Sequence, residues 1–442
     1  MSCAVETPIE TLLYGHKFLA RPFRLKSQAT RDCERQPETC EQHITITTQG
    51  TWNRHDTLLH LASIWKGPIS FALLVNTDRE AAEAVAMCQD VPNCRQYIDL
   101  HISVRAGHVA EHTGSFYPIN YLRNLAMHNV RTKLLYQLDV DNLPNESHAQ
   151  YVVWMTAAMA DPDVMDADTS ADCPGLHVFV PPAFEMTADD LNTIVTLKDG
   201  SPTIPKKALV DAALSGVALP MHGYYPPAYG PTGHNAWLTS GQTVRLNYVT
   251  RFEPYYIASV PVPLFNETFV NRGGNYAQQV YEMAAAGYSF WRLPQAFIID
   301  IPHSKATCAH AAHDDAEPGT TGVLADIHQD DIGDTETATE TSDNSDTNKD
   351  TNSATASAAV LVMSNESGQL DQTGALVSSL WLNFWEHICH RYGTHAPHPD
   401  SKEPYFADYR LSLGDLFSAQ KLRLDTVPMV EPSTDSRRDE HR

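Results

Sequence analysis

The sequence predicts an α/β fold with a mostly parallel central sheet. Strand-like and helix-like segments alternate from Ile44 onward, and residues 69–75 form a near-continuous apolar run. A strand with this composition is buried on both faces, as in a sheet covered by helices on each side. With 442 residues, the chain is long enough for one large domain or two of ordinary size.

The elements expected first along the chain follow from these periodicities. Residues 44–47 read Ile-Thr-Ile-Thr and predict a strand, and apolar residues from Leu58 to Ile64 recur at helical spacing. The sequence then predicts, in order, a helix at 79–87, a strand at 98–104, a helix at 118–129 that begins with Pro118, and a strand at 133–138.

The second half of the globular region continues the alternation. Thr187 to Asp190 resembles a capping box, which predicts a helix carrying Leu191 and Ile194. Other expected elements are strands at 177–180, 255–258 and 297–299, a helix at 276–286, and a last amphipathic helix in which Leu376, Leu380, Phe384 and Ile388 recur every four residues.

The charge of the chain is strongly negative. There are 54 acidic and 31 basic side chains, for a net charge of -23. Such a chain is a poor ligand for polyanions, so nucleic acid and anionic membrane surfaces are disfavoured as partners. Residues 314–350 hold 12 of the acidic side chains against a single lysine. This stretch and its polar continuation lack the apolar residues that a core requires and predict disorder.

Cysteines and glycosylation triplets allow a place in the secretory pathway without requiring it. The chain has eight cysteines, no CxxC pair, and Asn-x-Ser/Thr acceptor triplets at Asn145, Asn266 and Asn365. No signal peptide and no apolar run long enough to cross a bilayer is recognisable. We therefore expect either a soluble protein or one whose N-terminal anchor is missing from this sequence.

The clearest chemical motif is the pair Asp139 and Asp141. The pair directly follows the strand at 133–138, where the carboxyl ends of parallel strands form a ligand-binding edge. Two carboxylates one residue apart at such an edge can share a divalent cation. On its own, this motif is also typical of a solvated turn after a strand.

The surrounding motifs are more specific. Residues 116–124 read FYPINYLRN, residues 138–144 read LDVDNLP, residues 252–255 read FEPY and residues 293–303 read LPQAFIIDIPH. Two further motifs are WKGPIS at 65–70 and PAFE at 182–185. Taken together in their order along the chain, these motifs resemble glycosyltransferase family 49, which includes the second catalytic domain of LARGE-type enzymes and a β-1,4-glucuronyltransferase.

This resemblance implies a GT-A, Rossmann-like catalytic domain that binds a UDP-sugar through Mn²⁺ and transfers the sugar with inversion. Asp139 and Asp141 would be the metal and donor carboxylates, joined as ligands by His303 and by Asp300. The family pattern there resembles His-Met-Pro-His, so Asp300 replaces a histidine, and oxygen ligands also suit Mn²⁺. Tyr276 is a second departure, at a position where family members often carry a lysine.

Further site residues follow from the matching motifs. Asn120, Arg123 and Asn124 would orient the carboxylates or reach the diphosphate, since an arginine presents a planar fork suited to phosphate. Inversion needs a general base to deprotonate the acceptor hydroxyl. Glu185 and Glu253 are the expected bases. A surface ion pair for Arg123 and structural roles for both glutamates remain open alternatives.

The expected organisation is an N-terminal extension at 1–43, a catalytic domain at 44–305, a disordered insertion at 306–373, a C-terminal helix of the catalytic domain at 374–393, and a tail at 394–442. The expected partners are a UDP-sugar of the glucuronate or xylose class and a glycan or glycoprotein acceptor. By resemblance, the expected location is the Golgi lumen, with membrane contact only through a missing N-terminal anchor.

Two other functions compete with this interpretation. One is a non-catalytic, carbohydrate-binding relative of the family, which Asp300 and Tyr276 make credible. The other is a phosphohydrolase of the haloacid-dehalogenase type, in which the first Asp of a DxD motif is a nucleophile. That class places its motif near the start of the domain, whereas Asp139 follows at least two strands and is followed by Asn142-Leu143-Pro144.

Overall fold

The computed structural model of the chain describes residues 9–13, 16–41, 43–106, 117–168, 176–198, 201–223, 225–270 and 274–300, together with Leu380, Phe384, Trp385, His387, Ile388, His390 and Arg391. All of them belong to one of the two compact units into which the chain divides. The predicted insertion at 306–373, the tail at 394–442 and His303 lie outside the described residues, so these predictions stay untested, as do the domain boundaries.

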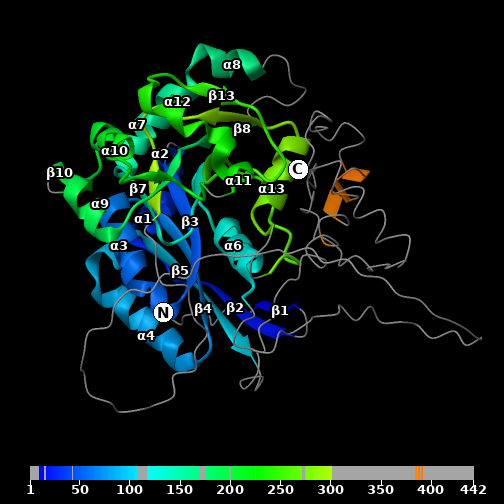
Figure 1. Cartoon of the computed structure of the whole chain (residues 1–442). Coiled ribbons are helices and arrows are strands. Elements are labelled where there is room, and N and C mark those ends of the chain that lie inside the picture. The colour runs from blue at the N-terminus through cyan, green and yellow to red at the C-terminus, as the bar shows by residue number, and fades with distance from the viewer. Residues whose placement is uncertain are drawn as a thin grey trace, which may run out of the picture. The chain divides into compact units, whose positions relative to one another are not determined.

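Within the described part, the main sheet has ten strands in the order β1-β2-β5-β4-β3-β6-β14-β8-β15-β13 (Figure 1). Strands β5, β4, β3 and β6 are mutually parallel, β8 is parallel to β15, and β14 runs antiparallel between β6 and β8. This arrangement confirms the predicted α/β fold with a largely parallel central sheet, the fold class expected for a GT-A domain. The strands are β1 (Ile9–Leu13), β2 (His16–Leu25), β3 (Ile44–Thr51), β4 (Ile69–Val75), β5 (Ile98–Ala106), β6 (Leu134–Gln137), β8 (His177–Val180), β13 (Val244–Leu246), β14 (Tyr256–Ser259) and β15 (Ser289–Arg292).

The sheet is buried on both faces, as the apolar run at 69–75 predicted. Alternate side chains of β4 point to opposite faces, so Ala72 and Leu74 pack with Leu122 of one helix, while Phe71 joins the core on the other side. The helices are α1 (Gln28–Arg35), α2 (Pro37–Cys40), α3 (His55–Trp65), α4 (Asp78–Asp90), α5 (Pro92–Tyr97), α6 (Ile119–His128), α7 (His148–Met159), α8 (Pro162–Asp168), α9 (Ala188–Ile194), α10 (Lys206–Leu214), α11 (Pro226–Tyr229), α12 (His234–Thr239) and α13 (Ala277–Ala285).

A smaller sheet lies beside the end of β6 and positions the acidic residues. Its order is β12-β9-β16-β7, formed by β7 (Asn142–Pro144), β9 (Ala183–Glu185), β12 (Leu219–Pro220) and β16 (Ile298–Asp300). Just after β7, the buried side chain of Asn145 fastens this sheet to its surroundings. The Asn145 Oδ1 atom accepts hydrogen bonds from the Phe297 backbone N–H at 3.0 Å and from the Tyr151 hydroxyl at 3.1 Å. A separate two-stranded pair is β10 (Thr196–Lys198) with β11 (Ser201–Thr203).

Most predicted elements are present, often extended by a few residues. The helix expected at 118–129 is α6, with Pro118 preceding its first residue. The capping box predicted at Thr187 is also observed, since the Thr187 hydroxyl accepts the backbone N–H of Asp190 at 3.1 Å. The structure adds elements within the expected N-terminal extension, where β2 pairs antiparallel with β5 and so widens the main sheet.

The described residues of the last helix pack against the rest of the domain. Phe384 and Leu380 are buried, and they pack with Phe269 and Tyr281 in one cluster. An ion pair joins Arg391 to Glu282 at 3.1 Å, and the Glu282 side chain is only 2% exposed. The described part of the predicted helix therefore contributes a buried apolar face and an ion pair to this compact unit.

Four of the described cysteines form two disulfides, Cys33–Cys40 and Cys88–Cys94, pairings that the sequence had left open. Each disulfide closes a short segment and connects neighbouring elements, α1 with α2 and α4 with α5. None of the described helices combines the length and the apolar character required to cross a membrane.

Candidate active site

The two motif aspartates lie in the turn that joins β6 to β7. The Val140 side chain between them is buried in the core, whereas Asp139 and Asp141 are both partly exposed. The backbone N–H of Asn142 donates to the Asp139 carbonyl at 3.1 Å and closes the turn. The apolar residue therefore anchors the motif, and the carboxylates on either side remain open to ligands.

Arg123 on α6 holds the first aspartate in place. Its Nη2 lies 3.0 Å from Asp139 Oδ1 and 3.4 Å from Asp139 Oδ2. The arginine is 2% exposed and Asp139 is 26% exposed, so the ion pair is buried on one side and open to ligands on the other. The alternative interpretation of Arg123 as half of a surface ion pair is wrong, because its guanidinium is enclosed by protein.

The enclosure of Arg123 explains why a tyrosine occupies position 276. The guanidinium carbon lies 4.7 Å from the centre of the Tyr276 ring and 5.0 Å from that of Phe265, distances typical of cation–π contacts. Nη1 also donates to Asn275 Oδ1 at 3.1 Å. Tyr276 therefore covers the cation, a role that a lysine at this position would oppose by charge repulsion.

The two asparagines of α6 contact the loop at residues 265–266. Asn120 donates to the Asn266 carbonyl at 2.9 Å, and Asn124 donates to the Phe265 carbonyl at 2.8 Å while accepting from the Phe265 N–H at 2.9 Å. These bonds fix the loop against the helix. A direct contact of either asparagine with a donor remains a prediction.

Other contacts to Asp139 come from residues that sequence reasoning did not single out. Gln49, on β3, donates to Asp139 Oδ1 at 3.3 Å, and the Tyr255 hydroxyl donates to Asp139 Oδ2 at 3.0 Å. The Tyr117 hydroxyl in turn bonds Gln49 Oε1. Tyr255 lies in the FEPY motif, but nothing in that motif indicates which of its residues meets the aspartate.

Asp300 joins the acidic group from β16. It lies opposite Asn142 of β7 and opposite Glu185 of β9 in the smaller sheet. The pKa of Asp300 is raised to about 7, chiefly by burial and then by the negative charges of Asp141, Glu185 and Asp139. Carboxylates from three strand ends thus repel one another electrostatically at this edge.

This donor set fits a hard divalent cation, because carboxylate oxygens are the ligands that Mn²⁺ prefers and a cation would relieve the mutual repulsion. Among the described residues, the oxygens of these carboxylates do not form a set of three within 4.8 Å of one another. The ligands would therefore have to draw closer on binding. The contribution expected from His303 lies outside the described residues.

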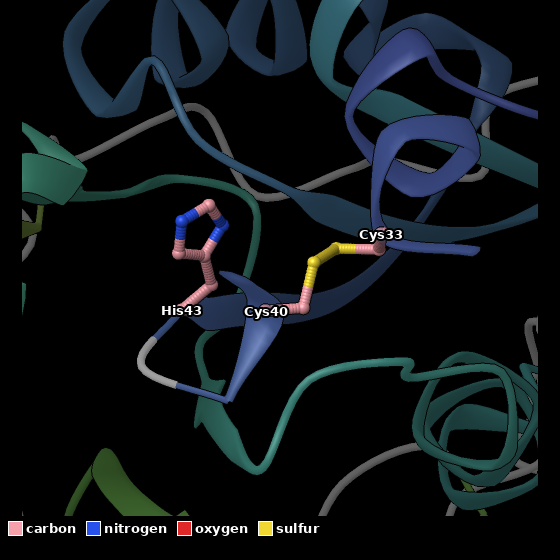
Figure 2. A group of neighbouring side chains, drawn as sticks. All are labelled: Cys33, Cys40 and His43. Atoms are coloured by element: carbon pink, nitrogen blue, oxygen red, sulfur yellow. A yellow bond between two sulfur atoms is a disulfide. The ribbon is translucent and has the colours of Figure 1, made fainter. Parts of the chain in front are cut away.

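A second cluster with metal-like spacing is not available to a metal in this state. Ligand atoms of Cys33, Cys40 and His43 lie within 4.8 Å of one another. Figure 2 shows that the two sulfurs are joined in a disulfide, with the His43 ring beside them. A disulfide offers no thiolate, and thiolate is the form of cysteine that binds metals, so this cluster is structural.

The two expected bases differ in their surroundings. Glu185 Oε1 accepts the backbone N–H of His222 at 2.7 Å and so fastens the turn after β12. The pKa of Glu253 is raised to about 7, mainly by burial, although the charge of Arg123 and a hydrogen bond from the Ala277 N–H lower it. A base is most effective when its pKa lies near the working pH, and the pKa of Glu253 suits that role.

The comparison with protein families agrees with these features. The sequence profile described as "Glycosyl-transferase for dystroglycan" matches residues 43–115 and 104–317, which is more than half of the chain. The match spans β3 to β16 and so includes Asp139, Arg123, Glu253 and Asp300.

Individual relatives point the same way. The xylosyl- and glucuronyltransferase LARGE2s of Gallus gallus is 29% identical over 266 residues, covering 59% of this chain and 32% of the relative. LARGE1 of Homo sapiens is 27% identical over 276 residues, covering 61% of this chain and 32% of the relative. The glycosyltransferase-like protein gnt14 of Dictyostelium discoideum is 24% identical over 308 residues, covering 69% and 44%. The chain thus spans only about a third of the length of the LARGE relatives.

Solved structures resemble the chain only distantly. S. aureus TarS in complex with UDP is 9% identical with a TM-score of 0.33, covering 58% of this chain and 60% of that one. GalNAc-T7 with UDP, GalNAc and Mn²⁺ is 9% identical with a TM-score of 0.36, covering 59% of this chain and 44% of that one. Values of this size carry no weight for the function, and the fold rests on the strand order itself. By the extent of the profile match, this chain belongs to the glycosyltransferase family described as glycosyl-transferase for dystroglycan, family 49.

Proposed function

We propose that this protein is a Mn²⁺-dependent, inverting glycosyltransferase that moves a sugar from a UDP-sugar to a glycan acceptor. The observation that carries the proposal is the acidic turn between β6 and β7, whose first carboxylate is held by the buried Arg123, in a chain that the family profile matches from β3 to β16. Family membership supports the reaction class, and the acidic turn supports the proposed position of the site.

The metal would be held by Asp141 and Asp300, with Asp139 orienting the donor and His303 as a further ligand. When bound, a divalent cation neutralises charge on the diphosphate leaving group. Arg123 holds Asp139 in place through the ion pair at 3.0 Å. The remaining work of the chain is to bind the donor at this edge, to place the acceptor opposite the leaving group, and to remove a proton.

Glu253 is the proposed general base. Its carboxylate would take the proton from the acceptor hydroxyl as that oxygen attacks the anomeric carbon and UDP departs. The pKa of Glu253 is raised mainly by burial, and the charges of Arg123 and Asp139 also act on it, which supports a place for it beside the acidic turn. Glu185, whose oxygen binds the His222 N–H, would then remain a structural residue.

The donor would be of the glucuronate or xylose class, since the LARGE relatives are named for both transfers. Location in the Golgi lumen is part of the proposal and agrees with two disulfides among the described cysteines, because disulfides persist in oxidising compartments.

A panel of UDP-sugars with Mn²⁺, scored for UDP release, tests the proposal. UDP-glucuronate or UDP-xylose should be turned over, and the double variant Asp139→Ala, Asp141→Ala should lose activity by at least about 100-fold, since charge-stabilising groups contribute on that scale. The control is Asp90→Ala, Asp189→Ala, which removes two exposed aspartates of α4 and α9.

Two outcomes would oppose the proposal. Equal activity in both double variants would place the chemistry elsewhere. If wild-type protein neither releases UDP nor binds it with Mn²⁺, the alternative of a non-catalytic, carbohydrate-binding relative gains the support that the transferase loses.

A further inference from the structure

A groove of about 430 Å³ lies apart from the acidic turn, between the end of α7 and two loops. Trp154 and the neighbouring alanines of α7 form one wall, and Asp161 and Asp163 continue it around the turn into α8. The opposite wall comes from Gln242 and Thr243, before β13, and from Gln295, between β15 and β16. Figure 1 shows α7, α8, α12 and β13 together at this end of the domain.

The chemistry of these walls fits a neutral saccharide. Trp154 is half-buried and packs on Tyr151, with ring centres 5.2 Å apart, so the indole is held in place while part of it faces the groove. An indole face is a broad apolar surface on which the C–H face of a pyranose ring can stack. Carboxylates and amides around it, from Asp163 and Gln242, supply the planar acceptors and donors that adjacent sugar hydroxyls need.

The same residues disfavour an anionic ligand. Two carboxylates face the groove, and no lysine or arginine is among the described residues that line it. A nucleoside diphosphate or a uronate placed there would meet like charge without a partner. The groove therefore suits an uncharged sugar chain better than it suits the donor.

The two loops of the groove are held in position before any ligand arrives. Lys206 Nζ donates to the carbonyls of Ser240 and Pro294, at 2.7 Å each, and thereby connects one loop to the other. The Trp237 indole N–H donates to the Leu293 carbonyl at 2.8 Å. Rigid walls reduce the entropy that binding would otherwise cost.

The groove is within reach of the acidic turn. Gln295 precedes Asp300 by five residues, and a fully extended stretch of that length spans at most about 18 Å. Asn145 donates to the Gln295 carbonyl at 3.2 Å and lies only four residues beyond Asp141. Gln295 and Asp300 are therefore at most about 18 Å apart, a separation that an acceptor of several sugar units is long enough to span.

We propose that this groove binds the acceptor glycan at neutral sugar units remote from the reacting hydroxyl, with Trp154 as the stacking platform. The inference rests on the proposed transferase function. Sugar units bound here would contribute to the affinity for long acceptors and would contribute nothing to the binding of donor or to its hydrolysis by water.

Binding and donor hydrolysis measured in the same variants test the groove. The probes are neutral β-linked tetrasaccharides of xylose, glucose, galactose and N-acetylglucosamine, titrated calorimetrically. The wild type should bind at least one of them, and Trp154→Ala should raise its Kd at least about tenfold. Val153→Ala is the matched control, because Val153 neighbours Trp154 on α7 and is 59% exposed outside the groove.

A second variant keeps the test informative if Trp154→Ala does not fold. Gln242 is exposed on a loop, and Gln242→Ala should weaken binding severalfold while the melting temperature stays unchanged. The groove proposal is overturned if no tetrasaccharide binds the wild type, or if both variants bind as the wild type does. Loss of binding with intact donor hydrolysis supports it, whereas binding without any UDP release in the wild type overturns the transferase and the acceptor role together.

Discussion

Asp139 is held by more partners than a simple metal ligand requires. Arg123 and Gln49 both donate to its Oδ1, and Tyr255 donates to its Oδ2. A carboxylate restrained in this way has little freedom to move toward a cation. In the proposed mechanism Asp139 would therefore orient the donor from a fixed position, and ligand movement on metal binding would fall to Asp141 and Asp300.

Glu253 gives a pH prediction at the residue scale. A base works only when deprotonated, and burial raises the pKa of Glu253 to about 7. The kcat/KM for transfer at saturating Mn²⁺ should therefore rise with pH, about tenfold per unit below pH 7, and level off above it. Glu253→Gln should lower this rate by about 100-fold or more and remove the rise, because the amide accepts no proton at these pH values.

The same shift has a consequence for stability. The folded-state pKa lies above the usual value of 4.5, so folding favours the protonated acid. That contribution is fully present below about pH 4.5 and is lost as pH rises through about 7. Relative to Glu253→Gln, the wild-type melting temperature should fall across this window. Glu185→Gln, which keeps an oxygen for His222, is the control. If Glu253→Gln kept the wild-type dependence of kcat/KM on pH, the base would be another residue.

The sequence predicted part of this site and missed the rest for a definable reason. Asp139, Asp141 and Arg123 lie in local motifs, and their placement after a strand and on a helix follows from periodicity. The contacts of Gln49, Tyr255 and Tyr276 join residues that are about 90 to 150 positions apart in the chain. Local patterns of composition carry no signal for pairings at that separation.

At the scale of elements, segments with a clear apolar pattern were predictable, and segments without one were not. The strand β4 was indicated by its continuous apolar run, and the helix α6 by apolar residues at helical spacing. The helix α7 has no such pattern, because Val153 and Met159 are 59% and 41% exposed, so its apolar residues mark no single buried face. The strand expected at 297–299 is present as β16, whereas the three-residue strands β7 and β9 were not predicted, because they depend on pairing with β16, which no single segment reveals.

The returning C-terminal helix supplies the prediction at this scale. Phe384 is 3% exposed and packs against Phe269 and Tyr281. Phe384→Ala removes a buried ring and leaves a cavity, so the free energy of unfolding should fall by about 3 kcal/mol. Urea denaturation followed by tryptophan fluorescence measures the change.

The exposed His390 of the same helix provides the control, and His390→Ala should change stability by less than about 0.5 kcal/mol. If Phe384→Ala were equally silent, the end of the chain would contribute nothing to the catalytic unit, and the cluster around Phe269 would be stable without it.

The whole molecule is acidic, and its proposed donor is an anion. With a net charge of -23, the chain should bind UDP weakly unless a cation is also present. We expect UDP with Mn²⁺ together to raise the melting temperature by several degrees and UDP alone to leave it nearly unchanged. At a ligand concentration of 100 Kd, the stabilisation is about 2.7 kcal/mol.

Chelation of Mn²⁺ should reverse this gain, and the Asp139→Ala, Asp141→Ala variant should show none of it. Thermal unfolding followed by circular dichroism distinguishes the cases. Equal stabilisation by UDP with and without the metal would mean that the diphosphate is bound by protein cations, and the role proposed for the acidic turn would be wrong.

Asn145 is both the fastener of the smaller sheet and the first residue of an Asn-Glu-Ser acceptor triplet. Its side chain is 2% exposed, with its oxygen bonded to Tyr151 and Phe297 and its nitrogen bonded to Gln295. Oligosaccharyl transfer replaces a hydrogen on that nitrogen with a large polar glycan, for which the buried position has no room. Modification of Asn145 and completion of the native fold therefore exclude each other. In a secretory compartment the two processes would compete for the nascent chain, and the yield of active enzyme would depend on β7 and β16 pairing first.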